Sequence, residues 1–325
     1  MKCLQCNAFG PVAQLVVTDV AAPEPGPGQV RIAVKAASLN YPDALMVQGL
    51  YQVRPQLPFV PGAEFAGVIT AVGAHVKGFL VGDRVVALGL GGFGEEAVAD
   101  ATQILRLPPG MDYAAGAAFF LTYCTSLRGL KNCAHLAPNE TLLVLGAAGG
   151  VGVAAIEIGK AMGATVIAAA SSDPKLELCR KLGADHLINY ELEPLRTRVD
   201  ALTGGKGVDV VYDPVGGRYT EEALRSTAWR GRLVVVGFAS GTVPKIPANL
   251  ALLKERTIVG LYWGESVARD PDAHAANVAQ LLEWYAVGRI NPVITEQIGL
   301  GGVPAAMERM LTRQVLGKVI VLPAC

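Results

Sequence analysis

The chain has 325 residues, which suggests two domains and enough length for a sizeable core. Its 28 lysines and arginines balance 28 aspartates and glutamates without runs of like charge, which argues against nucleic acid and anionic membranes as partners. Hydrophobic residues make up 51% of the chain, and the mean hydropathy is +0.37. The longest uncharged run, between residues 140 and 157, is interrupted by glycines and falls short of the roughly 20 apolar residues of a membrane span.

The N-terminus and the cysteines favour a cytoplasmic protein without a metal site. No apolar segment followed by a small-residue cleavage site begins the chain. Six cysteines are too sparse for a disulfide framework. Cys3 and Cys6 have metal-ligand spacing, but no second pair completes a tetrahedral site, and the histidines are isolated. We expect buried or edge thiols and structural histidines.

Two different patterns divide the chain. The first 120 or so residues contain short β segments broken by Gly and Pro, at 29–37, 65–72 and 84–87, and predict a small irregular β barrel. From Thr141, apolar strands alternate with helical periodicity. The strands are expected at 142–145, 165–168, 187–188, 208–212, 233–236 and 257–259, and the helices at 150–163, 174–182, 194–203, 218–228 and 247–254. This alternation predicts a doubly wound parallel sheet covered on both faces.

The C-terminal part is predicted to return to the first domain. A polar loop is expected at 265–272, helices at 275–287 and 303–312, and a final strand at 317–322. If that strand rejoins the N-terminal barrel, the first domain is discontinuous.

A glycine-rich turn follows the first strand of the second half. Gly146 to Gly152 lies between a strand and a helix, the context of a dinucleotide fingerprint. The pattern AxGxxG fits Ala147, Gly149 and Gly152. The second position lets the backbone approach a pyrophosphate, the third lets helix and strand pack closely, and the helix N-terminus offers N–H groups to phosphate.

The residues after the second strand favour NADPH over NADH. An NAD site has an acid there for the ribose hydroxyls, whereas this strand ends in Ser171 and Ser172, with Lys175 close behind. Asp173 is the contrary sign, and we interpret it as the helix N-cap before Pro174.

The motifs together resemble the zeta-crystallin-type quinone oxidoreductases, a zinc-independent branch of the medium-chain dehydrogenase/reductase superfamily. They occur in the expected order over almost the whole chain: 38–43, 49–51, 61–67, 81–85, 146–152, 181–184, 213–217 and 317–318. The resemblance implies an α/β protein with a discontinuous GroES-like β-barrel catalytic domain (1–121 and 260–325) and a Rossmann NADP-binding domain (122–259). It also implies a homodimer or homotetramer, and an apolar edge strand near 257–261 is the predicted seam.

Zinc separates the branches of this superfamily. Zinc alcohol dehydrogenases have a Cys before the first helix, a His in Gly-His-Glu and a second Cys after the barrel. The corresponding places here hold Asn40 or its neighbours, Ala63 and Thr122, which cannot make a zinc site. Without a Lewis acid, we expect reduction of an electron-poor acceptor.

The resemblance also implies roles for individual residues. Asn40 and Tyr51 would border nicotinamide and substrate, and either could hydrogen-bond the acceptor oxygen. Leu45 departs from members with a second tyrosine there, which leaves a pocket for polar quinones in doubt. Cofactor contacts are expected at Thr125, Gly149, Gly150, Val151, Gly152, Ser171, Lys175, Tyr190, Val215, Phe238, Tyr262, Trp263 and Lys318, the last at the 2′-phosphate.

The expected function is an NADPH-dependent quinone oxidoreductase that transfers hydride directly from the cofactor to a quinone. An enoyl or 2-enoate reductase acting on α,β-unsaturated carbonyls has the same hydride geometry and is the near alternative. An NADPH-binding, crystallin-like protein with little turnover is the alternative of another class.

Overall fold

The computed structural model describes residues 1–324, which form two compact units. Unit 1 comprises Met1–Leu121 and the C-terminal segment from Pro292, and unit 2 comprises Thr122–Asn291. The fold class is the predicted one: a GroES-like β unit with a parallel-sheet Rossmann unit.

Unit 1 is built on a sheet of order β14-β15-β3-β4-β5-β7, with β6 also paired to β3. β3 alternates buried and partly exposed residues over its first half, the period of a strand with one face on the core. β15 pairs antiparallel with β3, so the final strand rejoins the barrel as expected. The strands are β1 Lys2–Gln5, β2 Val16–Asp19, β3 Gln29–Leu39, β4 Glu64–Val72, β5 Arg84–Leu88, β6 Glu96–Asp100, β7 Ile104–Arg106, β14 Ile294–Ile298 and β15 Lys318–Val321.

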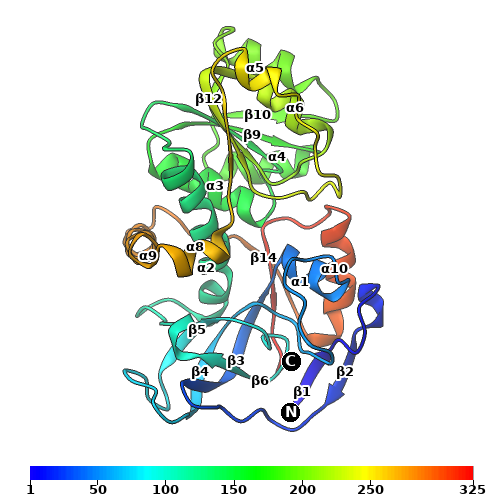
Figure 1. Ribbon diagram of the computed structural model, residues 1–325, viewed down its shortest axis with the longest axis vertical. Helices are drawn as coiled ribbons and strands as arrows, with labels where there is room; N and C mark the ends of the chain where they lie inside the picture. Colours follow the sequence, from blue (N-terminus) through cyan, green and yellow to red (C-terminus); the bar gives the residue numbers. More distant parts are fainter. Residues whose placement is uncertain (325) are drawn as a thin grey trace. The chain divides into compact units, whose positions relative to one another are not determined.

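Two helices of unit 1 come from opposite ends of the sequence. α1 (Tyr41–Val47) and α10 (Val303–Leu311) contact each other, and Figure 1 shows the red C-terminal helix beside the blue N-terminal one. Apolar residues of α10, including Val303 and Met307, share the core with barrel residues such as Phe65. The C-terminal segment therefore completes the core of unit 1.

Unit 2 contains a parallel sheet of order β10-β9-β8-β11-β12-β13 (Figure 1). Its strands are β8 Thr141–Leu145, β9 Thr165–Ala170, β10 His186–Asn189, β11 Val208–Asp213, β12 Thr227–Val235 and β13 Thr257–Gly260. Its helices are α3 Gly150–Ala161, α4 Asp173–Lys181, α5 Leu195–Thr203, α6 Arg218–Arg225, α7 Asn249–Leu252, α8 Trp263–Arg269 and α9 Pro271–Ala286, and α2 Tyr113–Leu127 leads into the unit.

Alternate residues of β8 face opposite layers. Leu143 and Leu145 belong to a core shared with α5 and α6. Leu142 faces the other way, where Gly159 of α3 approaches it so closely that an added Cβ would lie 2.8 Å from its Cδ2. Helices therefore cover both faces, which explains the fully apolar strands.

Two predicted segments differ from the structure, and one helix is absent from the prediction. Residues 226–228 were assigned to the end of a helix, but β12 begins at Thr227. The predicted polar loop at 265–272 is largely helical, in α8 and the start of α9. Helix α2 was not predicted, because it is apolar on nearly all sides and lacks an amphipathic period.

The second domain boundary also differs from the expected one. Residues 260–291 belong to unit 2 rather than to the barrel. α9 is bound there by polar contacts: Lys131 donates to Gln280 at 2.6 Å, and Asn277 donates to Asn132 at 2.7 Å. These contacts join residues far apart in sequence, so local periodicity could not reveal them.

None of the helices within residues 1–324 combines the length and the apolar character that crossing a membrane requires.

Candidate functional site

The glycine-rich turn connects β8 to α3 in unit 2. Gly149 is the N-cap of α3, and a Cβ added to it would meet only Gly146 O, at 3.4 Å. At Gly152 an added Cβ would lie 2.5 Å from Gly146 O and 2.6 Å from Ala147 O, so only glycine lets the helix pack on the turn. The first N–H groups of α3 have no acceptor within the helix. The turn thus fits a diphosphate at the helix N-terminus, as expected for Gly149 to Gly152.

A second layer holds the start of α3. Ser126 Oγ of α2 donates to Val151 O at 3.0 Å and lies 3.0 Å from the hydroxyl of Tyr212 in β11. Thr125, the neighbouring residue expected to bind the cofactor, is half-buried on α2. A hydroxyl of α2 therefore supports the first turn of α3.

Small and basic residues follow β9. Lys175 Nζ donates to Ser171 Oγ at 2.8 Å, so these two predicted 2′-phosphate residues lie together. Tyr190, after β10, packs its ring 4.5 Å from that of Tyr219. This end of the sheet offers an ammonium, a hydroxyl and an aromatic face to an adenosine phosphate.

Asp173 plays a different part from the expected one. The N-cap of α4 is Ser172, and Asp173 is the first helical residue. Its Oδ1 accepts a hydrogen bond from Asn189 Nδ2 at 2.9 Å. The carboxylate is therefore hydrogen-bonded to a side chain of β10, which makes it less available to ribose hydroxyls.

Two loops beyond β11 and β12 hydrogen-bond to each other. Ala239 N donates to Pro214 O at 3.0 Å, and Ser240 N donates to Val215 O at 2.9 Å. Val215 is buried, whereas the expected cofactor contact Phe238 is 37% exposed beside the first loop. With the glycine turn, these loops follow the carboxyl ends of adjacent strands, where open α/β sheets bind ligands.

Tyr262 and Trp263 lie at the start of α8. Tyr262 is the N-cap residue and is 52% exposed. The Trp263 ring lies 5.9 Å from the His274 ring of α9. Trp263 therefore packs within unit 2, and only Tyr262 is widely exposed.

Asn40 and Lys318 lie in a buried ionic network of unit 1. Lys318 Nζ donates to Asn40 Oδ1 at 2.5 Å and lies 3.7 Å from Glu64 Oε2. Asn40 Nδ2 donates to Glu64 Oε2 at 3.2 Å and to Ser38 O at 3.3 Å. Both amide hydrogens of Asn40 have acceptors within unit 1, which argues against its expected role as a donor to an acceptor oxygen.

The interior position of Lys318 also argues against its expected role. The residue is 2% exposed and sits in β15 among two carboxylates, those of Glu64 and Asp43. Burial lowers the pKa of Lys318, whereas the carboxylates raise it. We therefore assign this ammonium to the interior of unit 1 rather than to a 2′-phosphate.

Asp43 connects the network to α1. Its carboxylate accepts the backbone N–H groups of Asn40 at 2.8 Å and Ala63 at 2.9 Å. Burial raises the pKa of Asp43 to about 7, opposed by these donors and by Lys318. Burial likewise raises the pKa of Glu64, whose Oε1 accepts Leu121 N at 2.7 Å. The network fixes the turn that precedes α1.

Tyr51 lies in the bend after α1 and is half-buried. Residues 1–324 contain no cluster of three or more His, Cys, Asp or Glu side chains placed to hold a metal ion.

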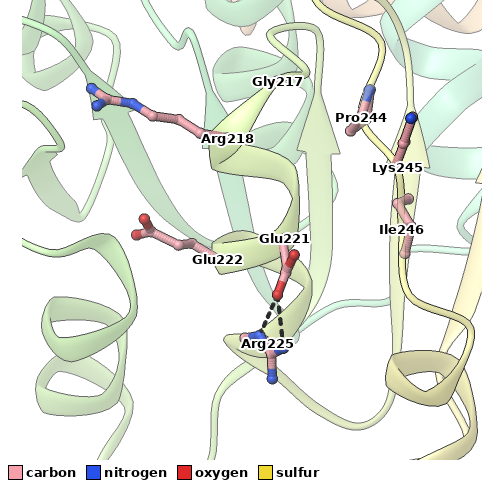
Figure 2. A pocket seen from close by; sticks show the side chains of 8 residues that line it. All are labelled: Gly217, Arg218, Glu221, Glu222, Arg225, Pro244, Lys245 and Ile246. Atoms are coloured by element: carbon pink, nitrogen blue, oxygen red, sulfur yellow. Dashed lines mark hydrogen bonds and ion pairs between the residues drawn. The ribbon is translucent and has the colours of Figure 1, made fainter.

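A groove of about 330 Å³ is lined by residues of α6 and of the segment 244–246 (Figure 2). Arg225 and Glu221 form an ion pair across its floor, with N···O at 2.7 Å. Its lining residues are Gly217, Arg218, Glu221, Glu222, Arg225, Pro244, Lys245 and Ile246. Arg218, Glu222 and Lys245 also line the groove, so its lining carries charges of both signs.

Two family models match the chain. The alcohol dehydrogenase GroES-like domain matches residues 26–109, and the zinc-binding dehydrogenase family matches residues 150–284.

Relatives match almost the full length. Bovine quinone oxidoreductase-like protein 2 is 40% identical over 94% of this chain and 88% of its own. The structure of Escherichia coli quinone oxidoreductase complexed with NADPH has a TM-score of 0.92 at 28% identity, covering 99% of this chain and 100% of that one. The structure of CurK enoyl reductase has a TM-score of 0.88 at 27% identity, covering 99% and 98%. The chain is therefore an oxidoreductase and belongs to the zinc-independent quinone oxidoreductase branch of the medium-chain dehydrogenase/reductase superfamily.

Proposed function

We propose that this protein is an NADPH-dependent quinone reductase. The observation that carries the cofactor choice is the Lys175–Ser171 pair after β9, where an ammonium and a hydroxyl meet at 2.8 Å and the carboxylate of Asp173 is hydrogen-bonded to Asn189. The NADPH complex of the Escherichia coli relative supports the same choice. The quinone is proposed from the names of the relatives.

The chain's own residues bind and orient the reactants. The N–H groups at the start of α3 bind the diphosphate, and Lys175 with Ser171 binds the 2′-phosphate. Val215 and Phe238 border the nicotinamide half. When bound, NADPH supplies the hydride. Tyr51 donates a hydrogen bond to the acceptor oxygen as negative charge develops there.

Substrate panels test the reaction. With quinones as acceptors, we expect NADPH absorbance to fall with saturable kinetics, and much more slowly with NADH. Oxidation only with enoyl thioesters or enones would replace the quinone by the alternative that the CurK likeness supports. Saturable NADPH binding without oxidation by any acceptor would instead indicate a binding protein with little turnover.

We also propose that β13 pairs with the same strand of a second copy. β13 is an edge strand of the unit 2 sheet, and its Ile258 is 38% exposed. An apolar open edge is a template for pairing. Sedimentation should show a dimer or tetramer that Ile258→Lys dissociates, whereas Val243→Lys at a 66% exposed site should not. A monomeric wild-type chain would exclude this seam.

A further inference from the structure

A buried carboxylate ends strand β11. Asp213 is 2% exposed, and its Oδ1 accepts the backbone N–H groups of Val215 and Gly216, both at 2.9 Å. Its Oδ2 accepts the hydroxyl of Thr220 in α6 at 2.6 Å. Burial raises the pKa of Asp213, while these three donors lower it. The Asp213 side chain thus connects the turn that follows β11 with the first turn of α6.

The turn that follows β11 packs against the glycine-rich turn. β11 and β8 are neighbours in register, with Tyr212 opposite Val144. A Cβ added to Gly146 would lie only 2.8 Å from Val215 Cγ2. Val215 is thereby fixed between the strand ends where the cofactor residues converge.

The same turn is held on its other side by the loop after β12. Asp213 O accepts the N–H of Val236 at 2.9 Å, and Gly217 N donates to Thr242 O at 3.0 Å. Gly216 has φ +71°, a left-handed conformation that most residues avoid. A turn in this conformation needs bonds that hold it, and the Asp213 carboxylate accepts its two central N–H groups.

We propose that Asp213 is a positioning residue for the dinucleotide, which holds Val215 and Gly216 against the glycine-rich turn without touching the cofactor. This inference rests on the proposed NADPH binding. It assigns to a buried side chain of β11 part of the affinity for the nicotinamide half, and none of the affinity for the adenosine phosphate half held by Lys175 and Ser171.

The same strand offers a matched control. Asp209, at the amino end of β11, accepts the backbone N–H of Thr141 through Oδ2 at 2.8 Å. Removing either carboxylate takes away support for a neighbouring backbone segment. Only Asp213 lies at the end of the strand that carries the predicted cofactor residues.

The experiment measures dissociation constants for NADPH and for its adenosine bisphosphate fragment by titration, alongside urea unfolding. In Asp213→Ala, NADPH binding should weaken about ten-fold or more, the order expected for a lost hydrogen bond to a charged group, with fragment binding unchanged. Asp213→Asn should recover part of the affinity, because its amide oxygen still accepts the two N–H groups. Asp209→Ala should lower stability without weakening NADPH.

The outcomes separate the two proposals. A wild-type chain that binds no NADPH overturns the proposed function. A wild-type chain that binds NADPH, with unchanged affinity in Asp213→Ala, overturns the positioning role alone. Equal weakening of NADPH and fragment, or weakening in Asp209→Ala as well, shows a merely structural role. If Asp213→Ala does not fold, Thr220→Val, which removes one of the three donors, must still weaken NADPH more than the fragment.

Discussion

The two units differ in the kind of buried polar groups that they contain. Unit 1 encloses the ammonium of Lys318 with the carboxylates of Asp43 and Glu64, which also accept backbone N–H groups. In unit 2 the buried carboxylate of Asp213 accepts two backbone N–H groups and a hydroxyl. In unit 1 the buried charged side chains are bound by other groups of the same unit. In unit 2 the Asp213 carboxylate holds a loop, and the first N–H groups of α3 have no acceptor within the helix.

The largest expected effect comes from breaking the ionic network of unit 1. Lys318→Met leaves two buried carboxylates without their cation and should lower the free energy of unfolding by about 3 to 5 kcal/mol, measured by urea denaturation. NADPH affinity of the folded fraction should not change. If a stable Lys318→Met variant bound NADPH weakly but NADH normally, Lys318 would be assigned to the 2′-phosphate site instead.

The next effect concerns the cofactor end of unit 2. Lys175→Glu should weaken NADPH relative to NADH by about 1 to 3 kcal/mol, because a charged hydrogen bond to the 2′-phosphate becomes a repulsion. Titration of both cofactors measures it. Lys181→Glu, an exposed change on the same helix, is the control and should leave the ratio unaltered. Equal losses for both cofactors in Lys175→Glu would defeat the assignment.

A pH effect of comparable or smaller size is expected near the end of unit 2. Glu157 accepts Asn291 N at 3.1 Å and is hydrogen-bonded to the Tyr123 hydroxyl, which also lies 3.0 Å from Asn291 O. One hydroxyl hydrogen cannot serve two acceptors, so the arrangement is complete only when Glu157 is protonated. Burial raises the pKa of Glu157 from 4.5 to about 7, although its hydrogen bonds with Tyr123 and Asn291 lower it.

The sign of the pH effect follows from that raised pKa. The unfolded chain ionises Glu157 near its ordinary value, so stability is fully present below that pH and is lost as pH rises toward about 7. Glu157→Gln supplies the missing hydrogen and should remove a pH-dependent loss on the order of 1 to 3 kcal/mol. Unfolding curves of both proteins across this range measure it, and other titrating groups cancel in the difference. Parallel curves would contradict the protonated arrangement.

The smallest effect is expected at Tyr51. Tyr51→Phe should lower kcat/KM for a quinone about ten-fold, through loss of one hydrogen bond to the acceptor, without changing NADPH affinity. Leu50→Ala, at a 69% exposed neighbour, is the control. An unchanged kcat/KM would remove Tyr51 from the chemistry.

Much of this molecule follows from local patterns. Apolar strands alternating with helices predict the unit 2 sheet, since both faces are covered and the strands need no polar face. The glycine turn and the residues after β9 predict a dinucleotide site, because backbone approach and phosphate charge impose residue types at fixed spacing. These are short-range constraints, and the sequence states them directly.

Side-chain partners across the chain were decided only by the tertiary structure. Asn40 and Lys318 are 278 residues apart, so their spacing gives no sign that their side chains hydrogen-bond to each other. Asp213 stands directly before Pro-Val-Gly-Gly, but only the tertiary structure shows that its carboxylate is a centre of hydrogen bonds. The sequence by itself determined the layers and the cofactor turn. The tertiary structure decided which polar groups are buried and paired in the interior, because burial and pairing depend on which strands become neighbours.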